Sequence, residues 1–278
     1  MFVDRVAYLV SGITGRFYQS RVCPACKSTN GSVCDRKYFH SLIECRSCGL
    51  LHRFPSESEE WAISYYNEGY AEPQAVQLPS DRELTDLLNN SFKGTDKDFT
   101  YHSAILKALG IRGRLLDYGA NWGYASWQFA RSGFDVVSYE ISQKMAEFGK
   151  KLGVSIETDI NRVGVNFDAV YSCHVLEHIH DPRSAIIKQL SLVKPGGLVV
   201  AHTPNGSHAY RTRAPSFSLI WGQAHPVLLT NNFIERVAEH RPFLVTSDDR
   251  PERVARWDQF SRIKDPCADG GLFFAIRA

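Results

Sequence analysis

Four cysteines in two pairs are the residues of this sequence whose spacing most clearly indicates a chemical role. Two residues separate Cys23 from Cys26 and Cys45 from Cys48, and eighteen residues lie between the pairs. This spacing lets both sulfurs of a pair turn toward one ion, and two pairs complete the tetrahedral site of a zinc ribbon. A site closed by four thiolates has no open coordination position, so we predict structural rather than catalytic zinc.

Disulfides or unligated thiols are the alternatives for the same cysteines. Disulfides require an oxidising compartment. The apolar run at residues 6–10 breaks at Ser11 and Gly12 before it reaches the length of a signal peptide. No apolar run approaches the roughly 20 residues of a membrane span. We therefore expect a cytoplasmic protein in which zinc binding is favoured.

A second pattern, LLDYGANWGY at residues 115–124, places an acid and two glycines where an apolar run gives way to a helical pattern. Gly119 and Gly123 let the backbone approach a ligand closely. The dinucleotide fingerprint G-x-G-x-x-G, which seats a pyrophosphate on a helix N-terminus, is not matched. Asp117 would repel phosphate but attract an ammonium or sulfonium group. The loop thus favours a cationic ligand and disfavours a nicotinamide cofactor.

Two further acids follow the next expected strands. Glu140 lies 23 positions after Asp117, where an acid can bind both ribose hydroxyls of an adenosyl group. Asp159 follows the third strand and is placed to reach an adenine amino group. Each acid alone has a solvated strand end as its alternative, but the three in register favour one adenosyl ligand.

The elements that must position these residues alternate regularly. The sequence predicts seven strands separated mainly by helices, with the strands at residues 114–120, 135–142, 154–160, 167–176, 195–205, 243–249 and 270–278. The helices are expected at residues 122–133, 143–153, 182–193 and 231–240. This alternation predicts an α/β fold with a doubly wound, mainly parallel seven-stranded sheet and ligands at the carboxyl ends of its strands.

Residues 114–205 resemble the core of class I S-adenosylmethionine-dependent methyltransferases, which is Rossmann-like. DYGANWG stands where that family has D-x-G-x-x-x-G, and the LEHI and PGG motifs stand after its fourth strand and before its fifth. Many members have glycine at the position of Asn121. The resemblance implies that the cofactor-binding loop contains Asp117, Gly119, Asn121 and Gly123 and that Glu140 binds the ribose. It further implies that Asp159 and Ile160 contact the adenine and that Cys173 and His174 form a wall on the cofactor side.

The cysteine pairs, followed by the aromatic stretch Tyr65-Tyr66-x-x-x-Tyr70, narrow this resemblance. They are similar to bacterial methyltransferases with an N-terminal zinc-binding module, a group that includes sugar C-methyltransferases. Such enzymes often carry a further C-terminal domain, which we do not expect here. The resemblance implies a small-molecule acceptor, and we expect a sugar or nucleotide-sugar of a glycan or secondary-metabolite pathway.

Histidines are the candidate general bases, because an oxygen or carbon acceptor must lose a proton and the pKa of histidine lies near working pH. His225, expected after the fifth strand, is the first choice, and His178 in LEHI is the second. Their alternatives are structural: His178 would brace its loop through a backbone hydrogen bond, and His225 would order a turn. Ala224 stands where sugar C-methyltransferases have an acid, which weakens their enolising mechanism here.

Three segments are expected: a zinc ribbon over residues 1–55, a helical linker or lid over 56–110, and an S-adenosylmethionine-binding domain over 111–278. Residues 1–53 hold eight Lys and Arg against three Asp and Glu, although the whole chain has a net charge of only +2. The basic ribbon leaves open an RNA or protein substrate, which we rank below a small molecule. A cofactor-binding scaffold without turnover is the third alternative.

Overall fold

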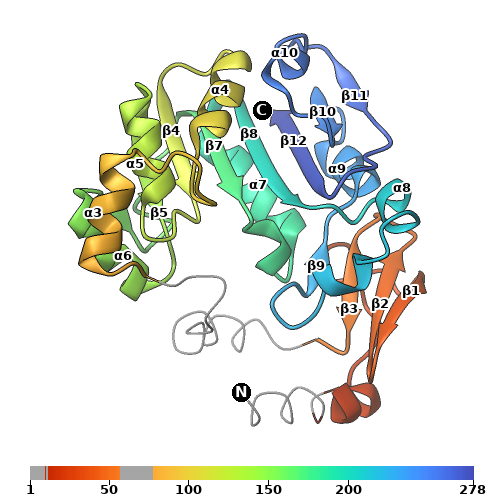
Figure 1. Cartoon of the computed structure of the whole chain (residues 1–278). Coiled ribbons are helices and arrows are strands. Elements are labelled where there is room, and N and C mark those ends of the chain that lie inside the picture. Colours follow the sequence, from red (N-terminus) through yellow and green to blue (C-terminus); the bar gives the residue numbers. More distant parts are fainter. Residues whose placement is uncertain (1–9, 11, 57–77) are drawn as a thin grey trace.

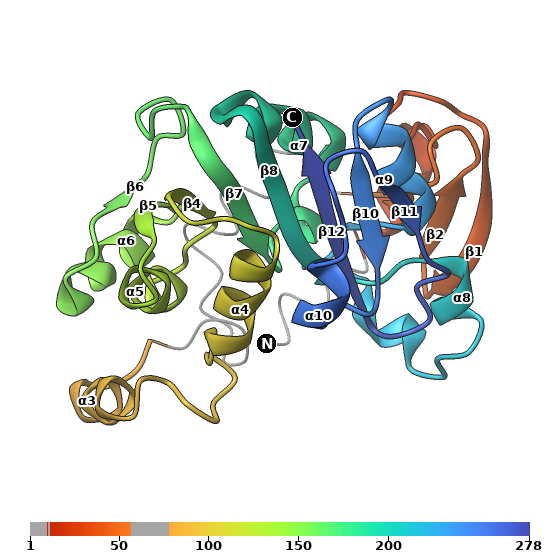
Figure 2. The same ribbon diagram turned by 90° about the horizontal axis from the view of Figure 1, so that it is seen from above.

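The computed structural model describes residues 10, 12–56 and 78–278. Its larger sheet has the strand order β11-β10-β12-β8-β7-β4-β5-β6 (Figures 1 and 2). The strands are Arg114–Tyr118 (β4), Asp135–Tyr139 (β5), Ile156–Glu157 (β6), Phe167–Cys173 (β7), Val193–Pro204 (β8), Phe243–Thr246 (β10), Arg262–Lys264 (β11) and Gly271–Arg277 (β12).

The predicted doubly wound, mainly parallel sheet is confirmed. The five neighbouring strands β6, β5, β4, β7 and β8 are all parallel to one another. β12 lies between β8 and β10 and is antiparallel to both. The sheet has eight strands rather than seven because β11 pairs with β10 at the edge. The prediction missed β11 because its three residues are too short and too exposed to form an alternating apolar pattern.

Helices cover both faces of this sheet (Figure 2). Buried residues of Thr100–Ala108 (α4), Tyr124–Arg131 (α5) and Pro251–Val254 (α10) share one hydrophobic core, and those of Pro182–Leu192 (α7) and Asn231–Ala238 (α9) share the other. Within β8, Val200 faces the first core and Val199 the second. Successive side chains of a strand point to opposite faces, so the central strands are apolar on both.

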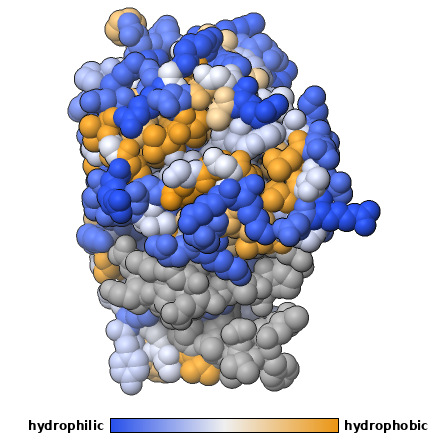
Figure 3. Space-filling model, turned by 90° about the vertical axis from the view of Figure 1, so that its left-hand side faces the viewer, coloured by the Kyte–Doolittle hydropathy of each residue, from blue (hydrophilic) through white to orange (hydrophobic). Residues whose placement is uncertain are grey.

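The helix Asp81–Asn89 (α3) precedes the large sheet in the chain. Ser80 is the N-cap, and it forms a capping box with Glu83. The helix packs beside Gln143–Gly149 (α6), since Leu84 and Met145 share a hydrophobic cluster. Figure 3 shows the face that carries these helices, where hydrophobic patches alternate with hydrophilic side chains. The aromatic stretch Tyr65-Tyr66-x-x-x-Tyr70, in the segment expected to form a linker or lid, lies outside the described residues.

A second, antiparallel sheet contains the strands Gly31–Lys37 (β1), His40–Cys45 (β2), Leu51–Phe54 (β3) and Val227–Leu228 (β9). Its last strand comes from the segment between β8 and α9, so the N-terminal sheet is completed by a much later part of the chain. The backbone N–H of Arg53 donates to Pro226 O at 2.8 Å, and Thr230 Oγ1 donates to Gly49 O at 2.8 Å. These bonds fix the small sheet beside the carboxyl edge of the large one. In the described ranges, no helix is long and apolar enough to cross a membrane.

Candidate active site and cysteine cluster

The glycine loop follows β4 at the carboxyl edge of the large sheet, as predicted. Asp117 is only 3% exposed, and its carboxylate accepts a hydrogen bond of 2.6 Å from Ser126 Oγ. Burial raises the pKa of Asp117 to about 7. Gly119 has φ +85°, and a Cβ there would lie 2.4 Å from Val175 Cγ2. Only glycine therefore fits where this loop passes the segment that follows β7.

Asn121 explains how the loop departs from the glycine that many related loops carry. Its φ is +53°, in the left-handed region that asparagine adopts more readily than most residues. Its Oδ1 accepts a hydrogen bond from the backbone N–H of Trp122 at 2.7 Å. The backbone N–H of Asn121 itself points to Glu140 Oε2 at 3.0 Å. Asparagine thus preserves the loop conformation, and its backbone links the loop to Glu140, the residue predicted to bind the ribose.

Glu140 lies directly after β5 and is half-buried against the glycine loop. Its second oxygen, Oε1, accepts from the backbone N–H of Ser142 at 2.9 Å. Burial raises its pKa. The two backbone hydrogen bonds hold the carboxylate in a fixed orientation, and each oxygen retains a further lone pair for a hydroxyl group.

The predicted adenine contacts lie further out. Asp159 is exposed, and its Oδ1 accepts from the backbone N–H of Asn161 at 2.9 Å, which caps a turn after β6. Ile160 is half-buried and packs against the hydrophobic core. One polar and one apolar side chain therefore lie together at the β6 end of this edge.

The predicted cofactor-side wall consists of Cys173, the last residue of β7, and His174, which follows the strand. Burial raises the pKa of the Cys173 thiol to about 12, so it remains neutral. The side chain of His174 is 64% exposed, and its backbone has φ +53°. A positive φ at a residue other than glycine is a strained conformation that is enriched at functional sites.

Glu177 is a residue of this edge to which sequence reasoning assigned no role. It is fully buried; Oε1 lies 3.1 Å from His174 Nδ1, and Oε2 accepts from Thr203 Oγ1 at 3.0 Å. Burial alone would raise its pKa, but the His174 hydrogen bond and the charges of His178 and His174 lower it overall. The hydrogen bond to Glu177 also raises the pKa of His174. The only signal for this contact in the sequence is the LEHI motif itself.

The two candidate bases lie together although 46 residues separate them in sequence. The ring centroids of His178 and His225 are 4.7 Å apart. His178 Nδ1 lies 2.7 Å from Ala224 O, and His225 Nδ1 lies 2.7 Å from Ile220 O. Because a carbonyl oxygen only accepts, each Nδ1 carries the proton and each Nε2 carries the ring's lone pair. The structural alternative for His178, a backbone hydrogen bond, is therefore present, and His225 makes a similar bond within its own loop. Their role as bases stays a prediction.

The loop that carries His225 is held by the N-terminal sheet. Trp221 is 2% exposed, and its Nε1 donates to Asp35 Oδ2 at 2.8 Å. Lys37 Nζ lies 4.7 Å from the centre of the Trp221 ring and donates to its backbone carbonyl. Nearby, Arg211 forms an ion pair with Glu44. The small sheet thus fixes the position of a candidate catalytic residue in a segment that follows β8.

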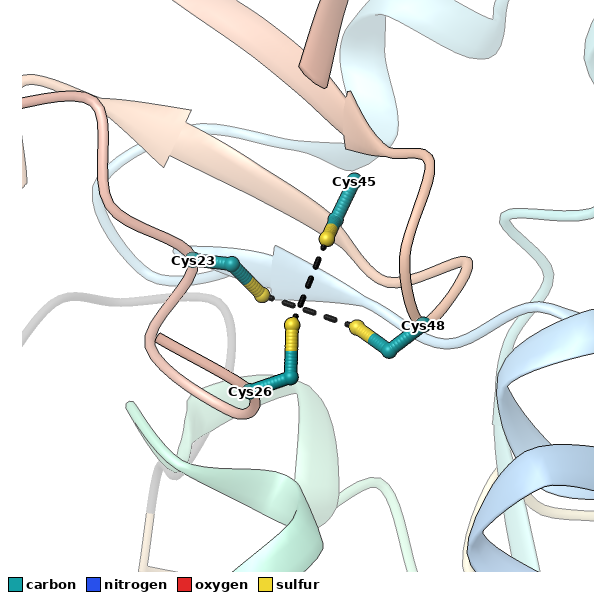
Figure 4. A group of neighbouring side chains, drawn as sticks. All are labelled: Cys23, Cys26, Cys45 and Cys48. Atoms are coloured by element: carbon teal, nitrogen blue, oxygen red, sulfur yellow. Dashed lines mark hydrogen bonds between the residues drawn. The ribbon is translucent and has the colours of Figure 1, made fainter. Parts of the chain in front are cut away.

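The four predicted zinc ligands converge (Figure 4). Cys23 Sγ lies 3.6 Å from Cys48 Sγ, Cys26 Sγ lies 3.4 Å from Cys45 Sγ, and all four sulfurs lie within 4.8 Å of one another. These separations exceed a disulfide bond of about 2.05 Å. They approach the ~3.8 Å between sulfurs that a tetrahedral zinc site with Zn–S bonds of ~2.3 Å requires. The donor set therefore fits zinc.

Strand order, the position of the glycine loop and the acid after the second parallel strand together define a class I methyltransferase fold. Residues 60–248, more than half of the chain, match the family model described as "Methyltransferase domain". The chain belongs to this methyltransferase family.

Comparison with solved structures supports the same fold. The plantazolicin methyltransferase BpumL, solved with a pentazolic desmethylPZN analog and S-adenosylhomocysteine, aligns with a TM-score of 0.51 at 12% identity. The alignment covers 77% of this chain and 93% of BpumL. At this identity, the similarity is one of fold.

Relatives of known function match in a shorter region. The ubiquinone biosynthesis O-methyltransferase of Cereibacter sphaeroides is 34% identical over 113 residues, which are 37% of this chain and 45% of that protein. The demethylmenaquinone methyltransferase of Renibacterium salmoninarum is 35% identical over 95 residues, or 32% and 40% of the two chains. The chain thus spans less than half the length of these relatives. Their names are those of quinone methyltransferases, and they lend no support to the resemblance to sugar C-methyltransferases.

Proposed function

We propose that this protein transfers a methyl group from S-adenosylmethionine to an oxygen atom of a small molecule. The observation that carries the proposal is the contact between the glycine loop and Glu140. The Asn121 N–H donates to Glu140 at 3.0 Å, and the same loop follows the buried Asp117. This arrangement offers a fixed carboxylate for ribose hydroxyls and a second carboxylate for a cationic group. Membership of the methyltransferase family supports the same reading.

Each residue of the edge then has a role in holding the donor. Asp117 faces the ammonium group of the methionyl part of the cofactor, and Gly119 and Gly123 let the loop backbone approach that part closely. Glu140 binds the ribose. Asp159 and Ile160 border the adenine, while Cys173 and His174 border the reacting methyl group. S-adenosylmethionine supplies an electrophilic methyl on a sulfonium, so the protein's main tasks are to align the acceptor and to exclude water.

The methyl acceptor binds beside His178 and His225, whose ring centroids are 4.7 Å apart. We propose that one of them takes the proton of the acceptor hydroxyl, with His225 as the first candidate and His178 as the second. Burial lowers the pKa of His178, which keeps its imidazole neutral and able to accept a proton. The names of the relatives make a phenolic quinone precursor the first acceptor class to test. A sugar or nucleotide-sugar hydroxyl is the second.

We also propose that Cys23, Cys26, Cys45 and Cys48 hold structural zinc. The small antiparallel sheet beside this cluster carries basic side chains, which a nucleic-acid-binding surface would expose. Two of them instead make contacts within the fold. Arg53 is 2% exposed, and Lys37 lies over Trp221. This use of its charges favours a scaffolding role for the ribbon over the delivery of RNA.

Methyl transfer from tritiated S-adenosylmethionine to a panel of phenolic quinone precursors, nucleotide-sugars and RNA tests the acceptor class. We expect label in a small-molecule fraction and a loss of at least about 100-fold in kcat for His225→Ala, the usual size of a general-base effect. His240→Ala, in an exposed turn, is the matched control. Label transferred only to RNA or protein would contradict the proposal. Tight S-adenosylhomocysteine binding without turnover of any acceptor would favour the scaffold instead.

A further inference from the structure

Three potential metal ligands gather where the two candidate bases meet. One oxygen of Glu177 and one ring nitrogen each of His178 and His225 all lie within 4.8 Å of one another. Glu177 is fully buried, and the two histidines are half-buried. Two histidines and one carboxylate are a donor set that binds divalent transition metals and leaves coordination positions open.

Contacts behind the three ligands resemble those of established metal sites. Histidines that bind metals usually donate their other ring N–H to a carbonyl or carboxylate, which fixes the ring and its tautomer. His178 does so to Ala224 O, and His225 does so to Ile220 O, each at 2.7 Å. In both rings the lone pair is therefore on Nε2. The carboxylate of Glu177 is oriented in the same way by Thr203 Oγ1 at 3.0 Å.

We propose that Glu177, His178 and His225 bind a divalent transition-metal cation that takes the oxygen of the methyl acceptor as a further ligand. Binding of the cation does not depend on the proposed methyl transfer, but its role in the reaction rests on that function. Zinc and iron(II) are the metals most often bound by two imidazoles and one carboxylate. The site is separate from the four-cysteine cluster, whose ligands are all thiols.

A cation at this position would change how the acceptor loses its proton. A hydroxyl bound to a divalent metal ionises more readily, and its proton passes to solvent water. The metal-bound oxygen then attacks the methyl carbon: the C–O bond forms with the oxygen's electron pair, and the C–S bond breaks to leave a neutral thioether. In this form of the reaction, His178 and His225 serve as ligands rather than as proton acceptors. Acceptors with two adjacent oxygens would bind the cation through both.

Metal counting on intact protein tests the site. Protein whose cysteine cluster is filled with zinc is titrated with Co²⁺ and followed by the absorption of the bound ion. We expect one Co²⁺ per chain at this site in the wild type. His225→Ala and Glu177→Gln should weaken it by more than about 100-fold, because loss of a direct ligand exceeds the ~10–100-fold effect of an outer contact. His240→Ala should bind as the wild type does.

Further measurements separate this inference from the proposed function. The thermal midpoint of each variant shows whether lost Co²⁺ binding reflects unfolding, and a folded His225→Ala variant that binds Co²⁺ as tightly as the wild type would overturn the site. Full methyl transfer after removal of the second metal, with the cysteine zinc retained, would overturn the cation's role and leave the histidines as bases. Failure of the wild type to bind S-adenosylhomocysteine would instead refute the proposed function, whatever the cobalt titration shows.

Discussion

At the scale of single residues, the buried acid at the tip of β4 sets how cofactor binding depends on pH. Burial raises the pKa of Asp117 to about 7, so the free protein carries a largely neutral carboxyl below that pH. An ammonium group is attracted to the carboxylate form only. Ligand binding must therefore release a proton at acidic pH and none well above neutrality.

We predict that S-adenosylhomocysteine affinity rises about tenfold from pH 6 to pH 8, since the ionised fraction of a group with a pKa near 7 increases by this factor. Calorimetry in buffers of different ionisation enthalpy measures both the affinity and the proton released. Asp117→Asn should bind more weakly at pH 8 and lose the pH dependence. An unchanged slope in that variant would assign the titration to another group.

Single residues also differ in how far the sequence predicts their role. Asp117, Gly119 and Glu140 could be predicted as site residues because local chemistry and spacing are visible in the chain, and the structure brings the loop and Glu140 together. Glu177 carried no assigned role, because its importance depends on contacts with His174 and Thr203 that form only when β7 and β8 lie side by side. The proximity of His178 and His225 likewise follows from the path of a long loop.

At the scale of elements, the small antiparallel sheet holds the acceptor loop. β3 pairs with β9, which begins two residues after His225, and β1 contributes the Asp35 carboxylate that binds Trp221. Neither contact involves the glycine loop or β5. Disturbing the sheet should therefore affect the acceptor and spare the cofactor.

Asp35→Ala provides this test at a single bond. It leaves the buried Trp221 N–H without its acceptor, which costs about 1–3 kcal/mol. We expect kcat/KM for the acceptor to fall by about fivefold or more while S-adenosylhomocysteine affinity stays within twofold. Asp96→Ala, whose side chain is 82% exposed, is the control. Equal loss of cofactor and acceptor binding would show that the sheet stabilises the whole protein rather than the loop.

At the scale of the whole molecule, the large sheet was predictable and the union of the two sheets was not. The interior segments of β7 and β8, at residues 169–171 and 198–201, are buried and apolar, which makes these strands recognisable in the sequence. The two residues of β9 have no pattern of their own, and their partner strand lies more than 170 residues earlier. Cys23, Cys45 and Leu50 share a hydrophobic core with α7 and α9, so the cysteine cluster and the methyltransferase fold are packed together.

Removal of zinc should therefore act on the whole protein. Without the metal, the four buried or half-buried sulfurs take up protons and lose the ion that ties the two cysteine pairs together, so the shared core loses its support at one end. We expect a chelated wild type, and Cys45→Ser, to lose at least about 2 kcal/mol, or about 4–8 °C in Tm for a domain of this size. Calorimetric scans with metal analysis measure this effect. Cys34→Ser, at an exposed thiol outside the cluster, should leave the Tm unchanged.

The central claim is that the joined glycine loop and Glu140 bind the adenosyl group of S-adenosylmethionine. Calorimetric titration of S-adenosylhomocysteine into wild type, Glu140→Ala and the exposed control Glu147→Ala tests it most directly. Hydrogen bonds to a charged group contribute about 1.5–3 kcal/mol each, so Glu140→Ala should weaken binding at least tenfold while Glu147→Ala matches the wild type. A folded, zinc-loaded wild type that does not bind S-adenosylhomocysteine, or a Glu140→Ala variant that binds it equally well, would contradict the assignment.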